Sequence, residues 1–363
     1  MKTYRVAIVG TGAIVSSHIE ALRQAGDRVE IVAAVDVDEA RVKNFCEQQA
    51  VPRWFTNAAD MFSAVQPDLV HILTPPSTHF DLCVQSLEAG AWVYCEKPLC
   101  ASLDQFDRLA EAESRTGRYI STVFQWRFGS AVKHLKRLMA ANELGQPLVG
   151  VCNTLWYRAP AYYQVPWRGK WATETGGATV GHGIHITDLF LYLFGDWRDV
   201  RAIAATLDRS IEVDTVSMAA LRFENGAMGT ITTSTVSPRQ ETYLRLDFQR
   251  ATVECTALYR YSNANWRYSI PDGSPDEANL NRWQTIEQDT MGSHAEQLAE
   301  LLDSMDKGER PLVSGAEARR IMDFNASLYK SAFRSEAVER GSISAGDPFY
   351  YSMNGALESV PKS

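Results

Sequence analysis

Cysteine is scarce in this sequence, and the few cysteines follow no pattern. The six of them form no CxxC pair and no Cys/His cluster at zinc spacing, which argues against a disulfide-framed or zinc-stapled domain. We expect reduced, mostly buried thiols and no metal site.

Long apolar runs and surplus positive charge are also missing. No run approaches the roughly 18 apolar residues of a membrane span, and the first residues lack the segment order of a signal peptide. Lys and Arg number 36 against 44 Asp and Glu, whereas proteins that cover a phosphate backbone need clustered basic residues. These absences predict a cytoplasmic protein with no membrane and no nucleic-acid partner.

The first third of the chain alternates short β-rich runs with segments of helical period. Such alternation predicts βαβ units and a doubly wound parallel sheet. Because the 363 residues exceed the usual size of a single core, we expect two domains, at residues 1–124 and 125–363. The strand candidates of the first domain are 4–9, 30–35, 69–73, 92–95 and 119–123.

The second part shows longer, antiparallel-looking runs and predicts a mixed α+β domain. Asn225-Gly226 between two of these runs is a strong hairpin signal, because both residues tolerate positive φ. Ile321, Phe324 and Leu328 recur on one face of a long C-terminal helix. The strand candidates are 148–156, 200–205, 217–223, 228–233 and 243–248.

A glycine motif follows the first strand and suggests a dinucleotide site. Gly10 permits a tight turn, and Gly12 lets the backbone approach a pyrophosphate at a helix N-terminus. Asp36 ends the second run, 24 residues after Gly12, where a carboxylate accepts hydrogen bonds from ribose hydroxyls and repels a 2′-phosphate. NAD is therefore favoured over NADP. The alternatives are an ordinary strand-to-helix turn and a solvated Asp, and Val15 departs from the small third position.

Glu96-Lys97-Pro98 follows the run 92–95, at the carboxyl end of a parallel strand, where ligands of open α/β sheets bind. The proline fixes its own φ and restricts Lys97. From position alone, a surface lysine before a turn is the competing interpretation.

Over nearly its whole length the chain resembles the Gfo/Idh/MocA oxidoreductases (glucose-fructose oxidoreductase / inositol 2-dehydrogenase-like). An ordered series of motifs carries the resemblance: Gly10-Thr11-Gly12-Ala13-Ile14 with His18, Thr74-Pro75-Pro76 with His79, Ala89-Gly90, Glu96-Lys97-Pro98-Leu99, Trp167-Arg168-Gly169-Lys170-Trp171, Gly176-Gly177, Gly183-Ile184-His185-Ile186-Thr187-Asp188 and Arg222-Phe223-Glu224-Asn225-Gly226.

The resemblance implies a Rossmann domain and a second domain with an open, predominantly antiparallel sheet, whose exposed face commonly forms a homodimer or homotetramer contact. It implies catalysis between the domains. Lys97 would bond the reacting oxygen, and His185 would exchange the proton, which suits a group that titrates near neutral pH. NAD would be held by residues 10–14 and by Asp36, Thr74, Pro75, Pro76, His79, Glu96 and Lys97.

One position departs from the family. Inositol-dehydrogenase-like members often have Asp four residues before the catalytic histidine, whereas this chain has Gly181. Either His182 or the substrate itself fills the vacated space, and a merely packed His182 is the alternative. Asp188 either orients the imidazole of His185 or caps a loop.

The substrate side is predicted to lie in the aromatic-rich stretch 156–171, since aromatic faces beside polar donors suit a ring-shaped polyol. The stretch could equally pack under the second domain or across a subunit interface. The substrate candidates, besides Lys97, His182 and His185, are Trp167, Arg168 and Arg127. Arg127 is expected to contact a substrate or cofactor oxygen bidentately, or to form an interdomain ion pair.

We therefore predict an NAD(H)-dependent oxidoreductase acting on a secondary alcohol or ketone of a sugar, cyclitol or related polyol. One alternative is an NAD-dependent glycoside-cleaving enzyme that uses transient oxidation. Another is a non-catalytic NAD-binding regulator, ranked last because Lys97 and His185 are intact.

Overall fold

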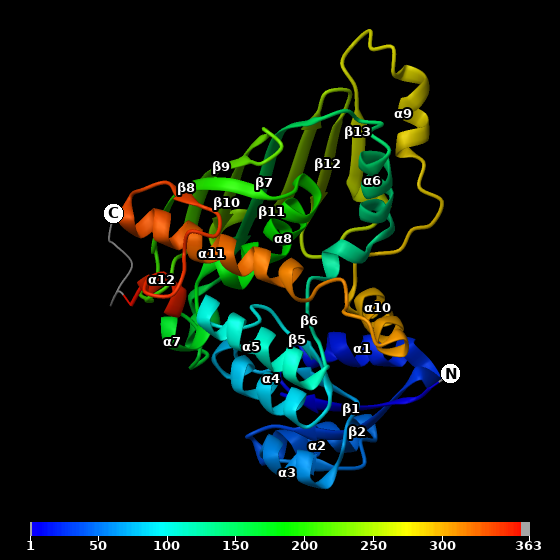
Figure 1. The fold of residues 1–363 in the computed structure, drawn as a ribbon, viewed down its shortest axis with the longest axis vertical. Coiled ribbons are helices and arrows are strands. Elements are labelled where there is room, and N and C mark those ends of the chain that lie inside the picture. Colours follow the sequence, from blue (N-terminus) through cyan, green and yellow to red (C-terminus); the bar gives the residue numbers. More distant parts are fainter. Residues whose placement is uncertain (1, 357–363) are drawn as a thin grey trace. The chain divides into compact units, whose positions relative to one another are not determined.

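The computed structural model describes residues 2–356 as two compact units (Figure 1). Among the described residues, the first unit runs to Val123 and includes His294–Arg319, and the second comprises Phe124–Ser293 and residues 320–356. Segment 294–319 therefore packs with the N-terminal unit, although the sequence assigns it to the second domain.

The first unit is a parallel six-stranded sheet in the order β3-β2-β1-β4-β5-β6, as predicted. The order reverses between β1 and β4, and ligands of such sheets bind at this switch point, beyond the carboxyl ends of the strands. The strands are β1 Tyr4–Val9, β2 Val29–Val35, β3 Trp54–Phe55, β4 Leu69–Ile72, β5 Trp92–Cys95 and β6 Ile120–Thr122. The helices are α1 Val15–Ala25, α2 Glu39–Gln49, α3 Ala58–Ala64, α4 His79–Glu88, α5 Leu103–Thr116 and α10 His294–Lys307.

Helix α10 joins this unit through its apolar face. Leu298, Leu301 and Leu302 recur at helical spacing and are fully buried in the same cluster as Ile8 and Leu22. The helix lies beside α1 (Figure 1). Burial of three leucines, at about 2 kcal/mol each, explains why the chain returns to the first unit.

The second unit is an eight-stranded sheet in the order β13-β12-β11-β7-β10-β9-β8-β14. Only the β7–β10 pair is parallel among the pairs described, so the predominantly antiparallel prediction is confirmed. Gly226, at φ +90°, closes the predicted hairpin between β9 and β10. The strands are β7 Pro147–Tyr157, β8 Trp197–Ala205, β9 Val216–Phe223, β10 Met228–Ser234, β11 Val236–Phe248, β12 Thr252–Ala257, β13 Trp266–Ser269 and β14 Val338–Glu339.

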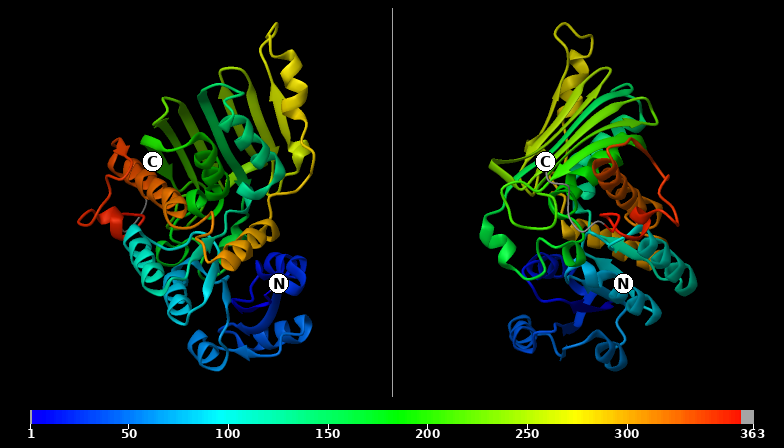
Figure 2. Two further views of the ribbon diagram at one scale, coloured as in Figure 1. Left: turned by 45° about the vertical axis from the view of Figure 1, so that its right-hand side comes forward. Right: turned by 90° about the vertical axis from the view of Figure 1, so that its left-hand side faces the viewer.

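Helix α8 (Ile184–Phe194) packs closely on one face of this sheet (Figure 2). A Cβ at Gly150 or Gly229 would lie 2.3 Å or 2.8 Å from the ring of Phe190, so only glycine lets the helix approach this far. The opposite face leaves Ile203, Met218 and Met228 exposed. The other helices are α6 Ser130–Ala140, α7 Trp171–Glu174, α9 Glu277–Gln284, α11 Ala316–Arg334 and α12 Pro348–Tyr351.

The six cysteines are free and buried, as predicted. Among the helices of the described residues, none is both long and apolar enough to cross a membrane.

A buried carboxylate fixes the segment before α8, which includes a π-helical turn at Thr179–Gly183. Asp214 accepts hydrogen bonds from the backbone N–H of Gly177 (2.9 Å) and Thr179 (3.0 Å), and from the hydroxyls of Thr179 (2.7 Å) and Tyr329 (2.6 Å). A Cβ at Gly177 would lie 1.9 Å from the backbone oxygen of Asp214. The turn that leads to His185 therefore requires glycine at position 177.

Gly177→Ala should destabilise the protein by about 3 kcal/mol or more, because backbone rather than a flexible side chain has to move. Urea unfolding measures the change. Gly181→Ala is the matched control. Apart from its chain neighbours and its own helix backbone, the new Cβ would contact only Glu174 Oε1 among the described residues, at 3.8 Å, and the stability should stay within about 1 kcal/mol of the parent. Equal unfolding midpoints for the two variants would show that the backbone of Asp214 does not exclude a side chain at position 177.

Candidate functional site

The glycine loop after β1 fits a dinucleotide pyrophosphate. Gly10 has φ +98°, and a Cβ there would lie 2.9 Å from the carbonyl of Leu73. Above Gly12 there is nothing within 4 Å of the Cβ position, so the backbone is open to a ligand. Helix α1 begins with no side-chain cap and no acidic residue in its first turn, which leaves its N–H groups and positive dipole end for an anion.

Asp36 lies at the end of β2 and bonds the same loop. Its Oδ2 accepts hydrogen bonds from the backbone N–H (2.9 Å) and the hydroxyl (2.8 Å) of Thr11, and its Oδ1 accepts one from the N–H of Asp38 (3.0 Å). Burial alone would raise the pKa of Asp36, but these hydrogen bonds outweigh it and lower the pKa. The carboxylate is thus charged and oriented beside Thr11.

The loop after β4 is tied to the loop that carries Lys97. His79 is fully buried, and its two ring nitrogens face backbone carbonyls: Thr74 O lies 2.8 Å from Nε2 and Pro98 O lies 2.7 Å from Nδ1. Pro76 begins the short helical turn Pro76–Thr78, which directly precedes His79. His79 therefore connects the predicted cofactor residues Thr74, Pro75 and Pro76 to the backbone just after Lys97.

Glu96 is a buried carboxylate held from three directions. His18 Nε2 and His294 Nε2 each lie 3.2 Å from its Oε1, and the N–H of Lys97 lies 3.3 Å from its Oε2. Burial acts to raise the pKa of Glu96, but hydrogen bonds from His18 and His294 hold it well below the usual range. Glu96 is therefore ionised, and each histidine Nε2 must be the donor.

This ionised carboxylate fixes the tautomers of two further ring nitrogens. His18 Nδ1 lies 3.0 Å from His71 Nδ1, and burial lowers the pKa of His18 to about 4. A neutral His18 that donates from Nε2 must accept at Nδ1, so His71 donates from its Nδ1. His18 Nε2, Glu96 Oε1 and His294 Nε2 lie within 4.8 Å of one another, a spacing a metal could bridge, but hydrogen bonds account for the arrangement.

Lys97 follows this cluster at the carboxyl end of β5. Its side chain is partly exposed, and its peptide bond to Pro98 is cis. Glu96 bonds the N–H of Lys97, and His79 bonds the carbonyl of Pro98. The lysine is therefore carried by a segment whose backbone is held on both sides.

In the second unit, His185 stands in the first turn of α8, nearly buried, with its ring edge-on to Tyr259 (5.5 Å between centroids). It lines a narrow hollow with His182, which packs edge-on against Trp156 at 5.5 Å. The hollow is lined by Trp126, Thr154, Trp156, His182, His185, Ile186, Thr242 and Tyr259.

Arg127 does bind bidentately, as predicted, but its partner in the structure is a carboxylate of the protein itself, that of Asp188. Its Nε and one terminal nitrogen donate to the two oxygens of Asp188, at 2.7 Å and 2.6 Å, and both side chains are 1% exposed. The pair lies within the second unit, so it is not the interdomain ion pair considered above. Asp188 likewise pairs with this guanidinium, and the substrate role of Arg127 loses its support.

The aromatic stretch stacks on its own arginines. The Arg168 guanidinium lies 3.8 Å from the ring centroid of Tyr162 and 4.2 Å from that of Trp167. It also donates to Glu174 Oε1 at 3.3 Å. Trp167 and Arg168 are both partly exposed.

Glu174 was not predicted, and its carboxylate lies close to the position of Gly181. Its Oε1 lies 3.8 Å from the Cβ position of Gly181, and apart from the two chain neighbours of Gly181 and the backbone of its own helix, no other atom of the described residues comes within 4 Å. Gly181 precedes His185 by four residues, which is about one helical turn. Glu174 is buried, and burial raises its pKa. The only sequence signal was an acidic residue beside the Gly176-Gly177 pair.

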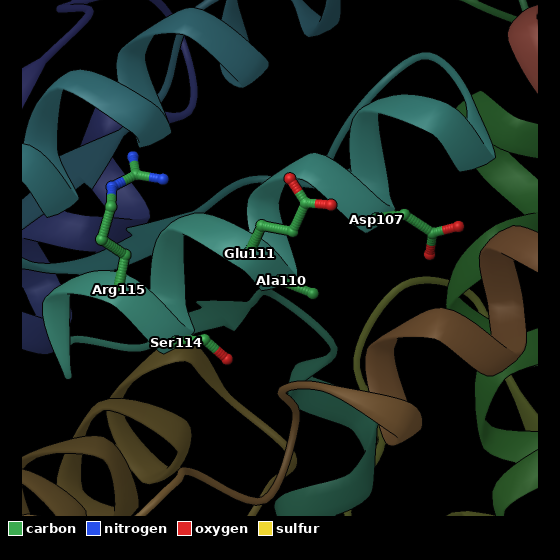
Figure 3. Close-up of a pocket in the computed structure, with 5 residues that line it drawn as sticks. All are labelled: Asp107, Ala110, Glu111, Ser114 and Arg115. Atoms are coloured by element: carbon green, nitrogen blue, oxygen red, sulfur yellow. The ribbon is translucent and has the colours of Figure 1, made fainter.

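A separate hollow lies along α5, lined by Asp107, Ala110, Glu111, Ser114 and Arg115 (Figure 3). All five residues come from one helix face, so the hollow is a surface depression. None of the predicted site residues lines it.

The family model described as oxidoreductase family, NAD-binding Rossmann fold (GFO_IDH_MocA) matches residues 4–124. The model of the GFO/IDH/MocA C-terminal domain matches residues 132–257. The chain belongs to the Gfo/Idh/MocA oxidoreductase family. The resemblance of the motifs and the choice of NAD as cofactor are thereby confirmed.

Named relatives match more than nine-tenths of the chain. A D-apiose dehydrogenase of Paraburkholderia graminis is 24% identical, covering 96% of this chain and 92% of the relative. A myo-inositol 2-dehydrogenase of Thermotoga maritima is 26% identical, covering 92% and 98%. The WlbA dehydrogenase of Bordetella pertussis, solved with NADH and UDP-GlcNAcA, has a TM-score of 0.83 and 25% identity, covering 93% of this chain and 98% of that structure.

The buried histidines predict a loss of stability in mild acid. Burial lowers the pKa of His18 to about 4 and that of His71 well below its ordinary value, so the folded state stays neutral while the unfolded chain binds protons below about pH 6.5. Stability should therefore fall as the pH drops from about 6.5 toward 4. At pH 5.5 each histidine should cost roughly 1 kcal/mol. Urea unfolding at pH 7.5 and 5.5, at constant ionic strength, measures the difference, and an unchanged or increased stability at pH 5.5 contradicts this assignment.

The closeness of Glu174 to position 181 predicts a coupling between the two sites. Gly181→Asp should destabilise the parent by about 1 kcal/mol more than it destabilises the Glu174→Gln variant, because two carboxylates then compete for one space. A double-mutant cycle by urea unfolding measures this term. Gly181→Asn, similar in shape but neutral, is the control and should show no coupling. A coupling that is equal for Asp and Asn would mean that sterics, not charge, dominate.

Proposed function

We propose that this protein is an NAD(H)-dependent dehydrogenase or reductase that transfers hydride between nicotinamide and a secondary alcohol or ketone of a sugar, cyclitol or related polyol. The observation that carries the proposal is Lys97, held by Glu96 and His79 at the carboxyl end of β5, in the same unit as the open glycine loop. The relatives named as dehydrogenases of D-apiose and myo-inositol, which match 96% and 92% of this chain, support the substrate class.

In this proposal NAD is held by Gly10, Thr11, Gly12, Ala13, Ile14, Asp36, Thr74, Pro75, Pro76, His79, Glu96 and Lys97. The nicotinamide supplies the hydride chemistry when bound. Lys97 donates a hydrogen bond from Nζ to the reacting oxygen, and His185 takes up or returns the hydroxyl proton at a ring nitrogen. His79 and Glu96 act by holding the segment of Lys97, and the uptake of a proton by Glu96 is disfavoured by its two histidine partners.

Substrate contacts are proposed for Trp167, Arg168 and His182, together with Lys97 and His185. This proposal is supported by the stacking of Arg168 on Trp167 and Tyr162, which places flat aromatic faces beside N–H donors. For Arg127 we propose a structural role instead, supported by its bidentate bond to Asp188.

We also propose that the protein is a cytoplasmic homodimer or homotetramer, with functional domains 1–124 and 125–363. The self-association is supported by large apolar side chains on the open face of the second sheet, where Ile203 is 67% and Met228 59% exposed. A reducing compartment is supported by the six free cysteines.

The test is a turnover assay with NAD+ against inositols, aldoses, sugar acids and glycosides, following reduced nicotinamide by absorbance. Lys97→Met and His185→Asn should each lower kcat/KM by about 10²- to 10⁴-fold. NADH binding by His185→Asn should stay close to that of the parent. Lys43→Met, an exposed lysine paired with Glu39 on α2, is the matched control and should keep full activity.

Three results would contradict the proposal. Full turnover by Lys97→Met would remove its assigned role. Cleavage of glycosides with no polyol or sugar giving reduced cofactor would favour transient oxidation. NAD binding without turnover in either direction would favour a regulator.

A further inference from the structure

We propose that the substrate site of the second unit takes an anionic sugar, and that Arg158 binds its carboxylate or phosphate oxygens. This inference rests on the proposed function for its turnover test. It begins from a guanidinium that forms no ion pair with the described residues. Across residues 2–356, no carboxylate oxygen lies within 4.0 Å of a nitrogen of Arg158.

The neighbouring arginines differ from Arg158 in this respect. Arg168 pairs with Glu174, Arg209 pairs with Asp208, and Arg127 pairs with Asp188. Arg158 is only partly exposed, and withdrawing a guanidinium from water is costly when no counter-ion compensates it. A substrate anion would supply the missing charge.

The groups that Arg158 contacts in residues 2–356 are electrically neutral. Its Nε donates to His182 Nε2 at 3.0 Å, and a terminal nitrogen donates to the carbonyl of Tyr157 at 3.1 Å. Its guanidinium carbon lies 4.8 Å from the ring centroid of Trp156 and 5.5 Å from that of Tyr162. Since His182 accepts at Nε2, its ring is neutral and carries its proton on Nδ1.

The backbone of Arg158 is fixed where β7 ends. Its N–H donates to Thr235 O at 2.8 Å, and its carbonyl accepts from Arg209 at 2.7 Å. The guanidinium is thus held in place next to the rings of Trp156 and Tyr162, which reduces the entropy lost on binding. Its unused N–H donors form the planar fork that suits carboxylate and phosphate oxygens.

Arg158 is also next to the proposed chemistry. Trp156 and His182, which it contacts, line the same hollow as His185. An anionic group held there would belong to the molecule whose hydroxyl His185 serves. The anion would therefore act as a specificity handle that orients the sugar ring and takes no part in the redox step.

The test compares acidic sugars with their neutral parents. Each hexuronate or aldonate is paired with its parent aldose, and hexose 6-phosphates form a separate arm that distinguishes phosphate from carboxylate. The parent enzyme should prefer the anionic member by at least tenfold in kcat/KM. Arg158→Gln should reduce that preference by about 10- to 100-fold, as expected for a charge-assisted hydrogen bond. Arg158→Lys should retain part of it.

Calorimetric titration of the NADH complex with glucuronate and with glucose gives a readout that does not need turnover. Tighter binding of glucuronate that weakens about tenfold or more in Arg158→Gln supports the inference even if no sugar is oxidised, in which case only the proposed function fails. Arg239→Gln, an arginine with an 83% exposed side chain on β11, is the control and should change neither readout. Equal binding of both sugars by the parent, or equal losses for both in Arg158→Gln, overturns the inference while sugar oxidation can still stand.

Discussion

The buried negative charge of Glu96 is the constraint on which the first unit depends. A carboxylate withdrawn from water is stable only if several donors compensate it, and its two ring donors come from residues 78 positions before and 198 positions after it. Helix α1, strand β5 and helix α10 must therefore be in place together. The same carboxylate bonds the N–H of Lys97, so the requirement that assembles the unit also holds the segment that carries the proposed catalytic lysine.

The second unit solves a comparable problem with close packing. Gly150 and Gly229 let α8 approach the sheet, and Asp214 collects four hydrogen bonds around the turn that precedes the helix. His185 therefore lies in the first turn of a helix whose packing on the sheet and whose preceding turn are both fixed. The aromatic rings and arginines of residues 156–171 belong to the same unit. One of these arginines, Arg158, has no carboxylate within ion-pair distance in the described chain. A rigid helix and turn, next to an arginine that has no ion-pair partner among the described residues, are the features expected of a binding site built on a scaffold.

Parts of this arrangement could be predicted because their signals are local. β1 and β5 have the expected bounds, and Asn225-Gly226 forms the expected hairpin, since periodicity and turn chemistry act over a few residues. Other parts depend on long-range partners. Strands β13 and β14 have four and two residues and take their structure from neighbours, and α10 shows an apolar face without saying which unit covers it. Likewise, no sequence pattern predicts that Arg127 pairs with Asp188 or that Glu174 lies next to Gly181, because these residues are brought together only by the fold.

The central claim is that this chain moves hydride between a sugar C–H bond and NAD. The most direct test uses a sugar or cyclitol that the enzyme oxidises, labelled with deuterium at the reacting carbon. Mass spectrometry of the NADH formed then shows where the deuterium goes. The account predicts that each NADH carries one deuterium and that the product ketone has lost it. NADH without deuterium, or deuterium exchanged into water, would contradict direct transfer and with it the role given to the site.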